Sequence, residues 1–232
     1  MTRAKPVVAI DGPAGVGKST TAREVAKRLG FVLVDTGALY RAVALAAREA
    51  AVDWEAADAL GELARGLDLA FRTDAEGAAR LVLAGVDRDD ELRTPALGQG
   101  ASKVSAHPPV REALLGVQRH LGREGGVVLE GRDIGTVVFP DAEVKVFLTA
   151  TPRRRAERRQ GDLEARGKTV PPLEALEAQM AERDKRDSMR PVAPLKAADD
   201  AIVMDTTHYS FDEVVRAIEA LVRERMADTR TD

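Results

Sequence analysis

Residues 12–19 read Gly-Pro-Ala-Gly-Val-Gly-Lys-Ser, which fits the pattern G-x-x-x-x-G-K-[ST] at every fixed position. An apolar run at residues 7–10 precedes the motif and a helical pattern at residues 18–29 follows it, so the motif lies at a strand-to-helix turn. Glycines let such a loop curl until its backbone N–H groups point at phosphate oxygens, and the helix N-terminus adds positive potential. The motif therefore predicts a phosphate-binding loop made of Gly12, Pro13, Ala14, Gly15, Val16, Gly17, Lys18, Ser19 and Thr20. In this loop Lys18 is expected to reach the β- and γ-phosphates of a nucleotide, and the Ser19 hydroxyl a Mg²⁺ ion.

Short apolar runs outside the motif are rich in β-branched residues and continuous, which is typical of buried parallel strands. There are five of them, at residues 7–10, 31–34, 127–129, 144–148 and 202–204. Helical patterns separate them, at residues 18–29, 38–51, 110–122, 152–165, 173–187 and 211–226. This alternation predicts an α/β fold with a doubly wound, five-stranded parallel sheet.

The stretch at residues 60–106 interrupts the alternation. Two runs of alternating apolar and polar residues, 67–72 and 79–83, flank the glycine-containing segment TDAEG at 73–77. Such a pair of runs is a hairpin signal. We expect a small antiparallel, β-containing insert beside the main core.

Composition excludes several classes of protein. The chain has 232 residues, a formal net charge of −3, 44% hydrophobic and 3% aromatic residues, which favours a globular core over a nucleic-acid binder. The absence of Cys excludes disulfides, cysteine-ligated metals and a Cys nucleophile, and the three scattered histidines argue against a His metal site. No run approaches the roughly 18 apolar residues of a membrane span, and the first run ends at Asp11, too early for a signal peptide. We expect a soluble, cytoplasmic chain with no membrane or nucleic-acid partner.

The phosphate-binding loop by itself is compatible with a kinase, a GTPase or an ATP-driven motor. A GTPase normally reads guanine with an N-K-x-D element, and this chain contains no Asn. Nothing in the sequence suggests the extra mass or the partner surface of a motor. A small-molecule kinase remains.

Charged residues follow the predicted strands at the edge where open parallel sheets bind ligands. Arg41 lies one helical turn beyond the second strand, and Glu130-Gly131-Arg132-Asp133 directly follows the third. Arg183, Arg186, Asp187 and Arg190 have helical spacing and share one face, which is compatible with a binding site or with a solvated surface. Five arginines lie within residues 151–160, which is more than one site needs, so some of them are expected to be solvated: Arg153, Arg154, Arg155, Arg158 and Arg159.

Five stretches of this chain together resemble the bacterial cytidylate kinase family, in the right order and over nearly the whole length. They are GPAGVGKS (12–19), DTGALYR (35–41), SKVSAHPPVREALL (102–115), EGRDIGTVVFPDA (130–142) and RDKRDSMRPVAPL (183–195). Thr36 stands where several members have Ser, and Glu130 where some have Asp; both exchanges keep the chemistry. The resemblance implies a single P-loop kinase chain with a monophosphate-binding insert and a short, arginine-bearing lid. The implied parts are a core (1–35, 107–150 and 191–232), a monophosphate-binding region (36–106, with the insert at 60–106), a lid (151–172) and an acceptor-site helix (173–190).

The resemblance further implies an enzyme that uses ATP and Mg²⁺ to convert CMP or dCMP to CDP or dCDP, and we expect it to be a monomer. A nucleoside monophosphate has a second phosphate pKa near 6, so its oxygen is a ready nucleophile and needs no general base. Catalysis then depends on positioning and charge neutralisation. Carried over by position, Arg41, Arg132 and Arg190 would hold the CMP phosphate, Arg183 and Asp187 the ribose side, and Ser102, Arg111 and Asp133 the cytosine edge, with Thr36 in the same substrate site. Lys18, Ser19, Arg155, Arg158 and Arg159 would contact ATP and the transferring group, and Glu130 would be an outer-shell Mg²⁺ partner.

Two alternatives stay open at this point. A kinase for another small acceptor, such as UMP or shikimate, would lack a paired Arg and Asp for a cytosine edge. A nucleotide-switched regulator would bind ATP without releasing ADP in response to CMP. Separately, the absence of Asn and Cys and the presence of only four Gln favour a heat-adapted protein, with a GC-rich genome as the competing explanation.

Overall fold

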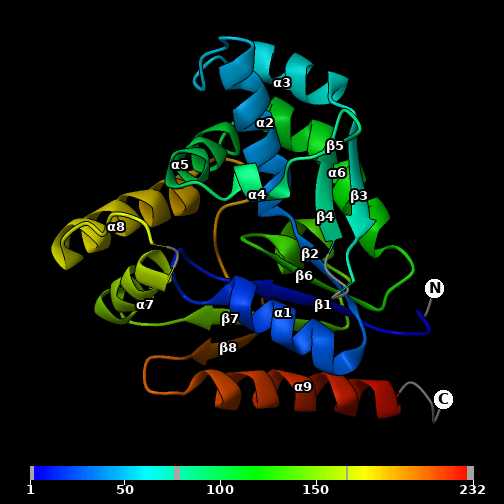
Figure 1. The fold of residues 1–232 in the computed structure, drawn as a ribbon. Helices are drawn as coiled ribbons and strands as arrows, with labels where there is room; N and C mark the ends of the chain where they lie inside the picture. Colours follow the sequence, from blue (N-terminus) through cyan, green and yellow to red (C-terminus); the bar gives the residue numbers. More distant parts are fainter. Residues whose placement is uncertain (1–2, 76–78, 166, 229–232) are drawn as a thin grey trace.

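The fold is known from a computed structural model that describes residues 3–75, 79–165 and 167–228. Its central sheet has the strand order β2-β6-β1-β7-β8, and every neighbouring pair is parallel (Figure 1). The strands are β1 (Val7–Asp11), β2 (Val32–Asp35), β6 (Val127–Gly131), β7 (Val144–Thr149) and β8 (Ile202–Asp205). The predicted five-stranded parallel sheet is confirmed, with each strand extending one or two residues further than its apolar run.

Helices cover both faces of this sheet, which explains why the inner strands are apolar without alternation. On one face, α1 (Lys18–Leu29) and α9 (Phe211–Asp228) lie side by side (Figure 1) and pack Val25, Val215 and Ile218 against the sheet. On the other face, apolar side chains of α6 (Pro108–Gly122) and of a π-helical turn (Ile134–Val138) pack against the sheet.

A second, mainly helical region is built around α2 (Gly37–Glu49), whose residues are buried on almost every side. A helix that is apolar all round needs partners all round. These are α3 (Ala57–Gly66), α4 (Asp89–Leu92), α5 (Pro95–Val104), α6 and a small antiparallel sheet of β3 (Leu69–Thr73), β4 (Ala79–Leu83) and β5 (Val86–Asp87).

The predicted insert at 60–106 is therefore only partly right. The hairpin is confirmed, because β3 pairs antiparallel with β4, but its first strand begins at Leu69 rather than at residue 67. Residues 76–78, which include the last two residues of the predicted TDAEG connection, lie outside the described residues. The helices of this stretch were missed. The start of α5 could have been predicted from Thr94 followed by Pro95. In the structure the Thr94 hydroxyl accepts the N–H of Leu97 at 3.3 Å as an N-cap, and Pro95 occupies the first turn.

Helices α7 (Pro152–Ala165) and α8 (Leu173–Met189) pack side by side next to the phosphate-binding loop (Figure 1). Arg190 is the first residue beyond α8 and has an extended backbone, which the following Pro191 favours. None of the helices in the described ranges is long and apolar enough to cross a membrane.

Candidate active site

The loop between β1 and α1 has the conformation that its glycines permit. Gly12, Gly15 and Gly17 all have positive φ, and a Cβ on Gly12 would lie 2.3 Å from the carbonyl oxygen of Leu148. The first-turn N–H groups of α1 have no partners within the helix, so they are available to an anion. The Lys18 ammonium curls back and donates to the carbonyl of Pro13 at 2.7 Å. Burial, together with the nearby charge of Arg132, holds the pKa of Lys18 well below its usual value.

Ser19 and Glu130 lie at the start of α1 and at the carboxyl end of β6. The Ser19 hydroxyl donates to the Glu130 carboxylate at 2.8 Å. Burial, followed by repulsion from Asp35, raises the pKa of Glu130 to about 7. A hydroxyl and a carboxylate are the hard oxygen donors that Mg²⁺ prefers, so these two residues fit the predicted metal position.

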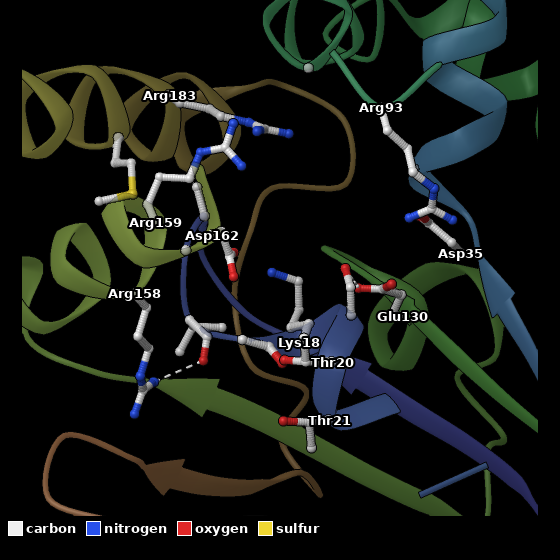
Figure 2. A pocket seen from close by; sticks show the side chains of 18 of the residues that line it. Lys18, Thr20, Thr21, Asp35, Arg93, Glu130, Arg158, Arg159, Asp162 and Arg183 are labelled. Atoms are coloured by element: carbon white, nitrogen blue, oxygen red, sulfur yellow. Dashed lines mark hydrogen bonds between the residues drawn. The ribbon is translucent and has the colours of Figure 1, made fainter. Parts of the chain in front are cut away.

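A cavity of about 940 Å³ opens in front of the loop. In Figure 2, Arg158, Arg159 and Arg183 lie on one side of it, Arg93 lies opposite, and Lys18 lies between them. Eight basic and three acidic side chains line this cavity, whereas the chain as a whole has a net charge of −3. The cavity therefore concentrates positive charge and suits a polyanionic ligand.

Three arginines that line the cavity, Arg41, Arg132 and Arg183, are candidates for a second anion site. Arg41 donates to Asp35 at 2.6 Å, and Arg132 donates to Asp187 at 3.0 Å. Burial, followed by the charges of Arg132 and Arg41, lowers the pKa of Arg183 to about 10. Within the described residues, the Nε groups of Arg41 and Arg183 are buried and have no hydrogen-bond acceptor. Buried, unsatisfied donors on crowded cations fit an anion bound between them.

Next to these arginines lies a buried polar cluster whose two carboxylates, Asp133 and Asp187, do not line the cavity. Its first half is Asp133, which accepts hydrogen bonds from Arg111 and, at 3.2 Å, from Arg190. Its second half is Asp187, which accepts from Ser102 at 2.9 Å as well as from Arg132. Burial alone would raise the pKa of Asp187, but the charges of Arg132 and Arg183 hold it below its usual value.

The structure distinguishes the arginines of residues 151–160, which the sequence could not rank. Arg154 and Arg159 line the cavity. Arg158 also lines it, but its guanidinium is held by the carbonyl of Val16 at 3.0 Å and by Thr206 at 2.7 and 2.9 Å. Arg155 is buried against the phosphate-binding loop, and the cavity lining does not include it.

The predicted site residues thus fall into two groups. The cavity brings together Ala14, Gly15, Val16, Gly17, Lys18, Ser19, Thr20, Arg41, Glu130, Arg132, Arg158, Arg159 and Arg183. The remaining predicted residues lie behind its wall: Gly12, Pro13, Thr36, Ser102, Arg111, Asp133, Arg155, Asp187 and Arg190.

Sequence reasoning missed several residues that line the cavity. Asp35 ends β2 and could have been found, because it lies at the carboxyl end of a parallel strand. Arg93 lies between α4 and α5 and donates to Asp89 at 2.8 Å. Its guanidinium points towards Asp35, which lines the same side of the cavity (Figure 2). No motif marks Arg93. Tyr209 and Phe211, before and at the start of α9, add apolar surface near Arg158.

Comparison with known proteins decides the family. The sequence model of the family described as cytidylate kinase matches residues 8–224. The chain belongs to the cytidylate kinase family. It is 50% identical, over 95% of its length and 94% of the relative's, to the cytidylate kinase of Geobacter sp. strain M21. It is also 51% identical to the bifunctional pantoate ligase/cytidylate kinase of Synechococcus sp. strain WH7803, over 98% of this chain and 46% of that longer protein. The resemblance drawn from the motifs is confirmed, and with it the class of nucleotide-phosphorylating enzymes.

Solved structures support the fold alone. A gluconokinase from Sinorhizobium meliloti 1021 is 15% identical and superposes with a TM-score of 0.50, over 99% of this chain and 98% of that chain. At this identity the shared feature is the fold and not the acceptor.

Proposed function

We propose that this chain transfers the γ-phosphoryl group of ATP to CMP and dCMP, producing ADP and CDP or dCDP. The observation that carries the proposal is the pair of buried, unsatisfied Nε donors on Arg41 and Arg183, in the same cavity as the phosphate-binding loop. One anion site at the loop and a second at these arginines are what two phosphorylated substrates require. Membership of the cytidylate kinase family supports cytidine as the acceptor base.

The phosphate-binding loop takes the triphosphate. Backbone N–H groups at the start of α1 donate to phosphate oxygens, and the Lys18 ammonium turns from the Pro13 carbonyl towards the β- and γ-phosphates. Burial disfavours the charged form of Lys18 and lowers its pKa, and a phosphate anion beside it would favour the charged ammonium again. Arg159, which lines the cavity, supplies further positive charge near the transferring group.

In the chemical step, an oxygen of the CMP phosphate attacks the γ-phosphorus of ATP. The new O–P bond forms as the bond between the γ-phosphorus and the β–γ bridging oxygen breaks, and that oxygen leaves with ADP. No side chain has to remove a proton, because the acceptor phosphate is mostly dianionic at pH 7. The protein therefore acts by alignment and by neutralising the charge of two phosphate groups.

The acceptor phosphate is assigned to Arg41, Arg132 and Arg183, which lie close enough for their charges to affect one another. This assignment exchanges Arg183 for Arg190 relative to the sequence prediction. Arg190 lies behind the cavity wall and donates to Asp133, so it fits a role in orienting that carboxylate. Asp187 and Ser102, which contact each other, are assigned to the ribose side.

The cytosine edge is assigned to Asp133 and Arg111, which lie behind the cavity wall, so recognition of the base requires that wall to open towards them. Cytosine presents an N4 amino donor beside the N3 and O2 acceptors, and an ionised carboxylate with a guanidinium is complementary to that pattern. Uracil presents O4 and N3–H at the same positions, which sets acceptor against acceptor and donor against donor. Polar groups left unpaired in this way reject a substrate strongly.

Mg²⁺ is assigned to Ser19, with Glu130 in its outer shell. When bound, the ion would neutralise charge on the β- and γ-phosphate oxygens. The residues present fit this role because the Ser19 hydroxyl and the Glu130 carboxylate already point at each other beside the phosphate-binding loop.

A coupled assay of ADP release across CMP, dCMP, UMP, AMP, GMP and shikimate tests the proposal. We expect CMP and dCMP to be the best acceptors and UMP to have a much lower kcat/KM. Preference for shikimate or UMP would favour the other kinases that the sequence left open. ATP binding without ADP release for any acceptor would favour a nucleotide-switched regulator. That the chain is a cytoplasmic monomer stays a prediction, and size-exclusion chromatography tests its monomeric state.

A further inference from the structure

Asp184 belongs to the charged segment of α8, but it contacts the phosphate-binding loop instead of the acceptor residues. One oxygen of its carboxylate accepts the backbone N–H of Ala14 at 2.9 Å. The Arg155 guanidinium, from α7, donates to the carbonyl of Ala14 at 2.9 Å and to the other carboxylate oxygen of Asp184. Its Nε donates to the carbonyl of Ala150 at 3.2 Å. Both backbone polar groups of Ala14 are thus held by one ion pair from two different helices.

This contact is buried and tightly packed. The side chains of Arg155 and Asp184 are 9% and 16% exposed, and Ala14 packs in a small apolar cluster with Leu176 and Met180. A Cβ on the neighbouring Gly15 would lie 2.7 Å from the Met180 sulfur and 3.0 Å from the carbonyl oxygen of Arg155. Charge-assisted hydrogen bonds in such a poorly hydrated place are strong, and losing one partner leaves the other charge buried.

The loop needs an external support of this kind. Its three glycines, Gly12, Gly15 and Gly17, have positive φ and the widest conformational freedom of any residue. The N–H groups that face a phosphate follow directly after Ala14. Fixing Ala14 therefore restricts where those donors point. The same helix, α8, carries Arg183 into the cavity one residue before Asp184.

We propose that Arg155 and Asp184 are a positioning pair, which holds Ala14 so that the following N–H groups of the loop are arranged for the phosphates of ATP. The proposal rests on the proposed function for its kinetic consequence. It differs from the sequence prediction for Arg155, because the guanidinium acts on the loop and not on ATP. Neither member of the pair touches a substrate in this account.

The test compares this pair with a second ion pair between the same two helices. Asp184→Asn and Arg155→Lys disturb the positioning pair. The Asn amide must turn a donor towards either Arg155 or the Ala14 N–H, so one contact is lost. Glu174→Gln and Arg153→Lys are the matched controls, because Arg153 and Glu174 also join α7 to α8, at 3.6 Å, but are 59% and 78% exposed. Each variant is measured for KM of ATP, KM of CMP, Tm, and amide hydrogen exchange of the loop without nucleotide.

We expect the two pair variants to raise the KM of ATP by about tenfold or more, as the loss of a charge-assisted hydrogen bond predicts. The KM of CMP should stay within about twofold, and exchange in the loop should become faster. The control variants should leave the KM of ATP, the KM of CMP and the loop exchange unchanged. An unchanged KM of ATP with unchanged loop exchange overturns the proposal. Equal rises in both KM values with unchanged loop exchange also overturn it, since that result indicates a general role of α8.

A variant that does not fold and a failure of the proposed function can both be told apart from a failure of this proposal. If Asp184→Asn does not fold, Arg155→Lys, which keeps the charge, decides by the same criteria. If the unmodified protein phosphorylates no acceptor, the proposed function fails. The exchange measurement needs no substrate and still decides whether the pair holds the loop.

Discussion

The two halves of the cavity are built in opposite ways. The nucleotide half is one contiguous segment, residues 12–20, and its phosphate donors are mainly backbone N–H groups at a helix start. The acceptor half draws single side chains from α2, α8 and the residue after β6, with further side chains from α5 and α6 behind the cavity wall, and most of its cations already have a carboxylate partner inside the protein. A loop of backbone donors depends on its conformation, whereas the acceptor half depends on a network in which each arginine also stabilises a buried acid.

This difference decides what a substitution does. In the loop, only Lys18 offers a side-chain charge to remove, so its loss should affect transfer alone. In the acceptor half, removing Arg41 or Arg132 takes away the cation that is hydrogen-bonded to Asp35 or Asp187, whereas Asp133 would keep one of its two arginines. Such a change is expected to disturb binding, turnover and local structure together.

Lys18→Ala should have the largest effect. We expect turnover to fall by about 10²–10³, because one charge contact to the transferring group is lost in a closed site. The KM of CMP should change little, since Lys18 lies on the nucleotide side. Steady-state kinetics with both substrates varied would check this, and near-normal turnover would contradict the role given to the loop.

Arg132→Ala should have the next largest effect on activity. Arg132 lines the cavity and holds Asp187, so it belongs to both parts of the acceptor half. We expect kcat/KM for CMP to fall by about 10², with KM and kcat both impaired. Isothermal titration with CMP and the Tm would separate lost binding from lost folding. A change confined to the KM of ATP would show that Arg132 serves the other half.

Asp133→Asn should lower the ratio of kcat/KM for CMP to kcat/KM for UMP by about tenfold, because the amide can offer an N–H to the uracil O4. The measurement is the ratio of the two kcat/KM values. The Asp35→Asn variant is a suitable comparison, because Asp35 pairs with Arg41 near the phosphate and should not alter the ratio. Equal kcat/KM for CMP and UMP in the unmodified protein would remove Asp133 and Arg111 from base recognition and leave the kinase assignment intact.

The smallest effect concerns pH. The pKa of Glu130 is raised to about 7, so its carboxyl is mostly protonated below pH 7 and ionised above it. Only the ionised form attracts Mg²⁺, so we expect the Mg²⁺ concentration for half-maximal activity to fall several-fold as pH rises from about 6 to 8. Glu130→Gln should flatten this dependence. A pH profile that is the same in both proteins would exclude Glu130 from the metal position.

The sequence predicted the nucleotide half well because its information is local. The motif at 12–19, the strand before it and the helix after it are neighbours in the chain, and α1 and α7 begin and end at the predicted residues. The acceptor residues were identified through family motifs, since nothing in their spacing brings residues 102, 111, 133 and 187 together. Their approach depends on how α5, α6 and α8 pack around α2 and the end of β6.

What the sequence determined by itself was therefore the α/β fold, its five parallel strands and the phosphate-binding loop, because the spacing of apolar residues and the conformational freedom of glycine act over a few residues. Only the tertiary structure decided which cations face the cavity. It buried Arg155 and Asp184 beneath the loop, brought Arg93 from an unpredicted connection, and enclosed Asp133 between two arginines. The physical reason is that the sequence does not show whether a charged side chain is solvated or pairs with a residue far away in the chain. Long-range packing alone decides between these two outcomes.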